Sequence, residues 1–293
     1  LGLGLPAQAA APGGGVVGIV EGSAVLVRQA TRYALSEGVK LAGDDIVEAA
    51  PGSHVQIEFG DGVVVSLADG ARVMLQPRWV QRRGPSGLVR VYVLGGWVKL
   101  SVPSNVSVDA AAVWLSVGPS LAPVAPGNTK PDRPATLVVR LLPPDYAVFV
   151  ESGRFRLSDR VEAQRQATLG ADDFVWRQGS NRLQQASKPS SDFVAGMPPL
   201  FRDALPARAG RFGDRVVPPR PLGEVAYADV APWLRGEPAL RVHLVDRWRG
   251  RSADPAFRAA VQASLSLHPE WEPVLFPQRQ VEWAASRASQ ASR

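Results

Sequence analysis

The sequence predicts a mainly β fold, in which a β-sandwich-like unit of short hairpin repeats is followed by a small α-helical C-terminal region. Three observations predict this class. Short runs of β-branched residues alternate with turns rich in glycine and aspartate, which is typical of antiparallel sheets. One pattern of strands and turns occurs twice along the chain. After it, the chain changes to helical spacing of apolar residues between prolines.

The composition fits a folded protein and excludes several kinds of site. Of the 293 residues, 45% are hydrophobic and 20% are charged, with a mean hydropathy of -0.04. Because the chain has no cysteine, disulfides, thiolate metal sites and cysteine nucleophiles are excluded. No run approaches the roughly 18 apolar residues that a membrane-spanning helix needs. We therefore expect no direct membrane insertion.

The first residues predict export. Residues 1–12 are apolar and small, with an A-x-A spacing at Ala7 and Ala9, which is typical of the end of a secretory signal peptide. We expect this segment to be a signal-peptide remnant and the protein to be periplasmic. Residues 13–18 match G-x-G-x-x-G, but Ala-Pro precedes them and a β-branched run follows. A dinucleotide site needs a strand before this motif and a helix after it, so we predict a linker instead.

The β elements follow in order from residue 16. Residues 16–27 and 55–67 are predicted as hairpins, because glycine and aspartate at positions 60–62 supply turn geometry. Residues 118–134 contain five prolines, which lack the N–H donors of a central strand, so a long surface loop is predicted there. The remaining predicted strands are 71–75, 88–93, 97–102, 106–108 and 113–117.

Two segments of the β unit share one pattern. Residues 20–47 and 150–175 each contain a strand, a glycine turn, an apolar alternation and a corner that ends in two aspartates. The pairs are Asp44-Asp45 and Asp172-Asp173, and aspartate accepts backbone N–H bonds in such corners. A turn role is therefore predicted for both. The alternative is an envelope hydrolase, in which one carboxylate from each copy would meet across a cleft. The recurrence predicts one β unit over residues 16–178.

Beyond the β unit, prolines and helical stripes divide the chain. Residues 179–221 are predicted as a Pro-rich connector, residues 222–283 as a small helical region and residues 284–293 as a disordered tail. Asp229 is predicted to cap a brief helix that ends at Leu234. A second helix is predicted over 238–248, where Leu240, Leu244 and Trp248 share one face. The predicted third helix begins at Asp254-Pro255 and is stopped by His268-Pro269.

The three histidines provide no metal or catalytic signature. His268 lies beside Glu270 and Glu272, but a metal site needs three or four converging ligands and no second histidine is nearby. We predict a helix-terminating loop there, with the indole of Trp271 on the core. His54 and His243 fall inside a predicted strand and a predicted helix, without a serine motif, so structural roles are expected. No cofactor is predicted.

The net charge of +6 and the pI of about 10.1 do not predict a nucleic-acid partner. Only four of the 33 basic residues are lysines, and apart from the pair Arg82-Arg83 the arginines are scattered singly among 27 acidic residues. Nucleic-acid binding would need cations gathered on one element and a groove-reading motif. An arginine-rich solvated surface is the prediction.

The spacing of glycines, aspartates and apolar residues over positions 16–75 resembles the FecR domain of bacterial envelope proteins, and the similarity continues more loosely to about residue 178. This resemblance implies a β-rich periplasmic module that transmits or receives protein contacts, as in regulators that link outer-membrane receptors to sigma factors. Because the motif consists of turns and core positions, it implies a fold more than an activity. The matching segments are Gly18-x-Val20, Leu41-x-Gly43-Asp44-x-Ile46 and Gly52-Ser53-x-Val55-x-Ile57-x-Phe59-x-Asp61-Gly62.

The function expected from these observations is a non-enzymatic protein-interaction or scaffold module of the bacterial envelope, with envelope proteins, membrane-bound ones among them, as partners. One alternative is a periplasmic regulator in a receptor and sigma-factor pathway. Another is a binder of peptidoglycan or other glycans, if some of the eight tryptophans are exposed. The candidate interaction residues are Trp79, Arg82 and Arg83 beside a glycine-rich turn, and Trp271 and Phe276 near the C-terminus.

Overall fold

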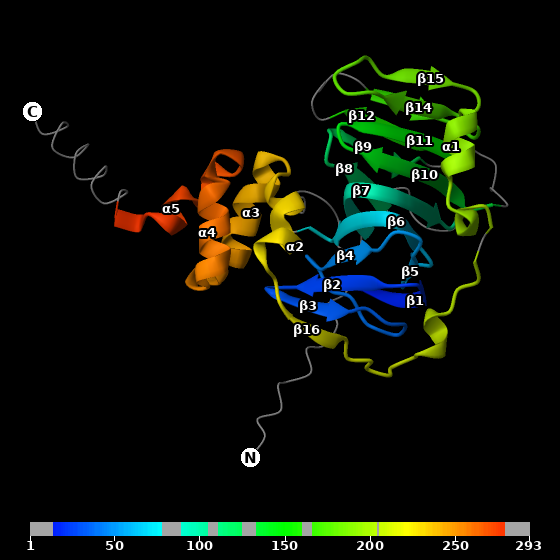
Figure 1. The fold of residues 1–293 in the computed structure, drawn as a ribbon. Helices are drawn as coiled ribbons and strands as arrows, with labels where there is room; N and C mark the ends of the chain where they lie inside the picture. Colours follow the sequence, from blue (N-terminus) through cyan, green and yellow to red (C-terminus); the bar gives the residue numbers. More distant parts are fainter. Residues whose placement is uncertain are drawn as a thin grey trace, which may run out of the picture. The chain divides into compact units, whose positions relative to one another are not determined.

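The computed structural model describes residues 14–77, 89–104, 111–124, 133–159, 166–203 and 205–278. The chain divides into a strand unit, residues 1–28 and 33–222, and a helical unit, residues 29–32 and 223–293. The mainly β fold with a small C-terminal helical region is confirmed (Figure 1).

The strand unit is one hydrogen-bonded sheet folded into two layers that share the long strands β6 and β7. One layer has the order β15-β14-β11-β10-β7-β6-β5-β1, and the other has the order β13-β12-β9-β8-β7-β6-β4-β2-β3-β16. The strands are β1 (Gly15–Glu21), β2 (Ala24–Arg28), β3 (Thr31–Ala34), β4 (Ile46–Ala49), β5 (His54–Phe59), β6 (Val64–Leu75), β7 (Val89–Val102), β8 (Ala111–Leu115), β9 (Pro119–Pro123), β10 (Ala135–Leu142), β11 (Asp145–Ser152), β12 (Phe155–Asp159), β13 (Gln166–Leu169), β14 (Phe174–Arg177), β15 (Gln184–Ala186) and β16 (Arg220–Glu224).

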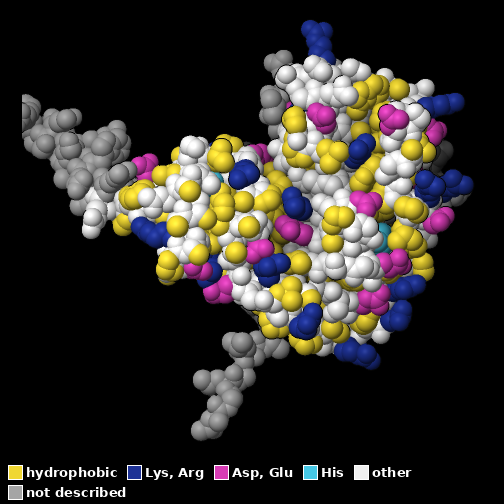
Figure 2. Space-filling model, in the orientation of Figure 1, with side chains coloured by type: hydrophobic (Ala, Val, Ile, Leu, Met, Phe, Trp, Pro, Cys, Tyr) yellow, Lys and Arg dark blue, Asp and Glu magenta, His cyan; other side chains and the backbone are white. Residues whose placement is uncertain are grey.

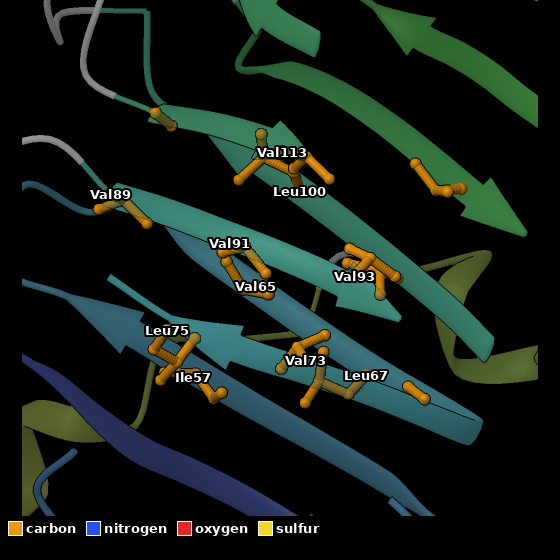
Figure 3. Packing of buried hydrophobic residues seen from close by; sticks show 14 of the residues in the cluster. Ile57, Val65, Leu67, Val73, Leu75, Val89, Val91, Val93, Leu100 and Val113 are labelled. Atoms are coloured by element: carbon orange, nitrogen blue, oxygen red, sulfur yellow. The ribbon is translucent and has the colours of Figure 1, made fainter. Parts of the chain in front are cut away.

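The main core lies between the two layers. Alternate residues of each strand point into it, as in β5, where Val55 and Ile57 are fully buried. Figure 3 shows Val65 next to Val91 and Leu100 next to Val113, in the cluster that the two layers share. Burial of valine and leucine side chains contributes about 1.5–3 kcal/mol each, so this shared core is the main source of stability.

Glycines allow β6 and β7 to pass from one layer to the other. The first half of β6 pairs with β5 and its second half with β4, with Asp69 (φ 41°) and Gly70 (φ 74°) between the halves. Opposite this bend, Gly96 of β7 has a φ of 87°. A Cβ atom on Gly96 would lie 2.3 Å from the backbone nitrogen of Ala71, so only glycine fits.

Several strand predictions need correction. Residues 119–123 of the predicted loop form β9, which pairs on both sides, with β8 and β12. Its prolines stand at the two ends of the strand, where a missing N–H is tolerated, and Leu121 between them is fully buried. Residues 16–27 are two strands that pair with different partners, not a hairpin. The hairpin at 55–67 is confirmed by the pairing of β5 with β6.

Other strand boundaries also differ from the prediction. Residues 71–75 continue β6, and residues 88–93 and 97–102 belong largely to the single strand β7. The predicted strand at 106–108 lies outside the described residues. The strand at 113–117 is found as β8, two residues earlier. Strand ends were predicted inside β6 and β7 because, in the sequence, a glycine at the bend of a long strand resembles a glycine in a turn.

The two aspartate corners have the same structure, which explains the sequence repeat. Asp44 (φ 65°) and Asp172 (φ 70°) both adopt the left-handed conformation. The carboxylate of Asp45 accepts a hydrogen bond from the N–H of Ala42 at 2.8 Å, and that of Asp173 accepts one from the N–H of Gly170 at 2.6 Å. The turn role predicted for these acids is therefore confirmed.

The helical unit contains α2 (Tyr227–Leu234), α3 (Pro238–Trp248), α4 (Pro255–Ala263) and α5 (Glu272–Leu275), with short 3₁₀ turns between them. The boundaries of α3 and the capping of α4 by Asp254 are as predicted. Helix α2 begins two residues before Asp229, whose carboxylate accepts a bond from the N–H of Ala226. Asp229 is thus a first-turn residue and not the cap. No described helix combines the length and apolarity needed to cross a membrane.

Candidate interaction surface

The outer face of the first layer, which points away from the main core, contains the most distinctive set of side chains in the strand unit. The strand register aligns two rows across β5, β6, β7, β10, β11 and β14. Residues 174 and 176 at the β14 end are aromatic, whereas residues 56 and 58 at the β5 end are polar. The two rows are His54-Ala68-Trp97-Arg140-Ala147-Trp176 and Gln56-Ser66-Lys99-Val138-Phe149-Phe174.

A segment of the same unit covers this face. We call residues 190–203 and 205–209 the strap. It contains α1 (Ser191–Gly196), a 3₁₀ turn η2 (Pro199–Phe201) and the start of a second turn η3 (Ala209–Arg211). Figure 1 shows the chain passing from β15 through α1 and along the strand unit toward β1. This segment lies within the predicted Pro-rich connector, and neither α1 nor β15 was predicted from the sequence.

Three apolar side chains of the strap pack on this face, and Phe193 lies against its aromatic part. The ring of Phe193 is 5.0 Å from Trp97, 5.0 Å from Phe174 and 6.4 Å from Phe149, measured between centroids. Met197 and Phe201 belong to the same buried cluster, and Phe201 is fully buried. Tilted and edge-to-face arrangements at these distances are favourable for aromatic rings.

Polar side chains of the face bind the main chain of the strap. The ammonium group of Lys99 donates to the carbonyl oxygen of Phe201 and also pairs with Glu151 at 2.8 Å. The amide Nε2 of Gln56 donates to the carbonyl oxygen of Pro206 at 3.2 Å. Only main-chain atoms of the strap take part in these two contacts.

Glu58 makes the most extensive of these contacts. Its two carboxylate oxygens accept bonds from the N–H groups of Arg208, at 2.7 and 3.0 Å, and Ala209, at 2.9 Å. Gln56 donates a further bond at 2.9 Å. Gly18 of β1 makes room for this carboxylate, because a Cβ atom there would lie 2.0 Å from Oε1 of Glu58. Charge-assisted bonds of this kind hold the main chain without reading its sequence.

His54 lies beneath the strap at the β5 end. It is 3% exposed, and its ring is 6.0 Å from that of Phe201 in an edge-on arrangement. Burial lowers the pKa of His54, while the nearby Glu21 carboxylate opposes this effect. The imidazole is therefore neutral near pH 7, as its apolar surroundings require.

Two of the interaction residues predicted from sequence lie in the helical unit, and the other three lie outside the described residues. Trp79, Arg82 and Arg83 lie outside the described residues. Trp271 is fully buried in the helical unit, with its ring 5.8 Å from Phe257. Phe276 is half-buried in the same unit, after α5.

The strap surface was missed because its signals are weak in the sequence. Phe193, Met197 and Phe201 recur every four residues in the predicted connector, and this spacing could have indicated a docked segment. Gln56 and Glu58 alternate with core residues, and this pattern equally fits a solvated face.

The acidic residues that the sequence suggested for a metal site or a hydrolase can be located where the structure describes them. No group of three or more histidine, aspartate or glutamate side chains could hold a metal ion in this part of the chain. Asp45 binds Arg28, with its carboxylate 2.6 Å from Nη2, and Asp173 binds Gln185 at 3.1 Å. Both carboxylates therefore have structural partners.

The described tryptophans form no exposed cluster, and charges of both signs are mixed on the face that Figure 2 shows. Among the six described tryptophans, four are buried and two, Trp114 and Trp176, are half-buried, so none stands out as a glycan-stacking platform. On the face seen in Figure 2, basic and acidic side chains of the strand unit are interspersed and neither kind forms a continuous patch.

Comparison with known proteins gives partial structural similarity only. No family model matches the chain, and no curated protein matches it. Two crystal structures of a "putative anti-sigma factor" from Parabacteroides distasonis ATCC 8503 are similar to part of this chain, each with a TM-score of 0.37. Their sequence identities are 18% and 17%, and each match covers 51% of this chain. The matches span 63% and 62% of those structures, which is less than two thirds of their length. The FecR resemblance remains a prediction.

Proposed function

We propose that this chain is a non-enzymatic protein-interaction module of the bacterial envelope, and that the outer face of its first layer binds peptide segments. The observation that supports this function is the docked strap. It shows which chemistry the face accepts: large apolar side chains together with main-chain hydrogen-bonding groups.

The contacts with the strap are of the kind used in peptide recognition. The rings of Trp97, Phe149 and Phe174 provide apolar contact area around one aromatic side chain. Lys99 and Glu58 bind carbonyl and N–H groups, which every peptide offers. A buried aromatic cluster beside a polar border is the usual arrangement of a protein interface.

The envelope location and a regulatory role are the finer parts of this proposal. They are supported by the resemblance of residues 16–75 to the FecR domain. A regulator in a receptor and sigma-factor pathway would be a special case of the same activity, because such a protein acts by binding other proteins.

The test is photo-crosslinking in bacterial cells that produce the full chain. A photoreactive amino acid is placed at Gln184, which is exposed in β15 and pairs with Trp176 at the edge of the aromatic region. The matched control carries it at Val242, which is 57% exposed in the helical unit. We expect position 184 to capture an envelope protein that position 242 does not. Capture of cytosolic proteins alone, or no capture, would overturn the proposal.

A further inference from the structure

We propose that the strap is an internal ligand of a peptide-binding face, and that a partner segment with the same apolar spacing displaces it. This inference rests on the proposed function and specifies its partner. The partner is a protein segment with an aromatic residue, a flexible apolar residue four positions later and a second aromatic residue four positions after that, as in Phe193, Met197 and Phe201.

The strap is separate from the main core. None of its residues belongs to the large cluster between the two layers, and no strap residue lies in a described strand. Phe193, Met197 and Phe201 pack in the smaller cluster with Trp97, Val138 and Phe174. The two-layered core is therefore complete without the strap, and release of the strap does not require the sheet to open.

The strap is too short to keep its shape alone. Helix α1 has six residues and η2 has three, whereas isolated helices shorter than about 12–15 residues are marginal in water. The outer side of α1 is exposed, with Val194 at 44% exposure. Its conformation thus depends on the contacts that it makes with the face, as expected of a segment that orders on binding.

The specificity for a partner follows from which contacts involve main-chain atoms and which involve side chains. The contacts of Lys99, Gln56 and Glu58 involve main-chain atoms of the strap, so another segment can supply them. The aromatic contacts depend on side chains and their spacing. Selectivity therefore lies in the positions equivalent to Phe193 and Phe201.

Both flanks of the strap are fixed to the strand unit. Before it, β15 pairs with β14. After it, Val217 forms a bridge with Val39. Exchange of straps between two copies would require one of these flanks to detach as well, whereas a partner segment requires only release of the strap. The flanks also keep the strap at a high effective concentration, so it competes with the partner.

The experiment measures binding of a fluorescein-labelled peptide with the sequence of residues 189–210, by anisotropy. The protein is the full chain, either unchanged or with Phe193→Ala and Phe201→Ala together. The weakened strap should compete less, so we expect the double variant to bind the peptide at least about tenfold more tightly than the unchanged chain. A peptide with both phenylalanines replaced by alanine should bind neither protein.

A change on the face provides the matched control. Adding Phe149→Ala to the double variant removes one ring around the Phe193 position, and binding should weaken again. Circular dichroism verifies that each variant is folded. Absence of peptide binding by the folded double variant, or equal binding of the two peptides, would overturn the inference.

A second measurement uses the unchanged chain, so that the test does not depend on how the variants fold. Excess peptide should accelerate hydrogen exchange at the N–H groups of Phe193 and Phe201 and leave the exchange of β5 and β10 slow. No acceleration at millimolar peptide would contradict displacement. If light scattering showed that the double variant forms a dimer, the face would bind a second copy of this chain, and the inference of a partner protein would be overturned. If position 184 still captures an envelope protein while the peptide does not bind, this inference fails and the proposed function stands.

Discussion

Replacement of the second aspartate in each repeated corner tests the role of the acid pairs. Asp45 is 2% exposed and accepts bonds from Ala42 N at 2.8 Å and from Arg28 at 3.0 and 2.6 Å. This hydrogen-bonded pair raises the pKa of Arg28, although burial of the guanidinium opposes the effect. Asp173 accepts bonds from neutral donors, Gly170 N and the side chain of Gln185. Asp45→Asn would therefore remove an ion pair with an arginine, whereas Asp173→Asn would remove no ion pair.

The structure gives different magnitudes for the two changes. Loss of one member of a buried ion pair costs about 3–5 kcal/mol, but the side chain of Arg28 is 31% exposed, so solvent screening reduces this to about 2–3 kcal/mol for Asp45→Asn. In Asp173→Asn the new side chain would retain an oxygen that accepts from Gly170, and the loss is about 0.5–1 kcal/mol, as for one neutral hydrogen bond.

The assay is urea denaturation of the full chain, followed by far-ultraviolet circular dichroism and analysed for the strand-unit transition. We expect the midpoint to fall clearly for Asp45→Asn and slightly for Asp173→Asn, with unchanged slopes. Equal losses for the two variants would refute the reasoning from the Arg28 pair. An unchanged midpoint for Asp45→Asn would refute the structural role of the corner itself.

Three further changes test other parts of the fold. In Gly96→Ala, a residue with a φ of 87° would gain a Cβ atom 2.3 Å from a backbone nitrogen of β6, and thermal denaturation should show a loss of stability of about 3–5 kcal/mol. The control Gly52→Ala has a φ of 68° but open space around the new Cβ atom, and should lose about 1 kcal/mol. Similar losses for the two variants would contradict the close approach at Gly96. Asp254→Ala removes the cap of α4, so hydrogen exchange of the N–H groups of Ala256 and Phe257 should become faster, and an unchanged rate would argue against the cap. Burial lowers the pKa of both His54 and His268 in the folded chain. As the pH falls below about 6.5, the histidines of the unfolded chain therefore take up protons before those of the folded chain. The free energy of unfolding, measured in urea, should be constant above about pH 6.5 and fall between about pH 6.5 and 5. Constant or rising stability over that range would contradict the burial of the two imidazoles.

Much of the fold follows from local patterns in the sequence. Alternation of apolar residues such as Val55 and Ile57 identified β5, and Asp254-Pro255 fixed the start of α4. The corner at Asp44 was predictable because its conformation is local. These features depend on residues close together in the chain.

The candidate surface depended on information that the sequence does not contain locally. Glu58 and Arg208 are 150 residues apart, and only the strand order brings them together. Pro119 and Pro123 led to the prediction of a loop. Their tolerated position at the two ends of β9 depends on the pairing of that strand with β8 and β12, which the local sequence does not reveal. The strap had no periodic pattern long enough to stand out from a connector.

The strap binds to a strand unit that is folded without it, and it is not part of the core of that unit. Native-state hydrogen exchange of the unchanged chain at increasing urea measures this directly. We predict that the N–H groups of Phe193 and Phe201 exchange through a local opening of lower free energy than those of Val138 and Val148 in the sheet. Exchange of all four with one common free energy and one urea dependence would contradict the account.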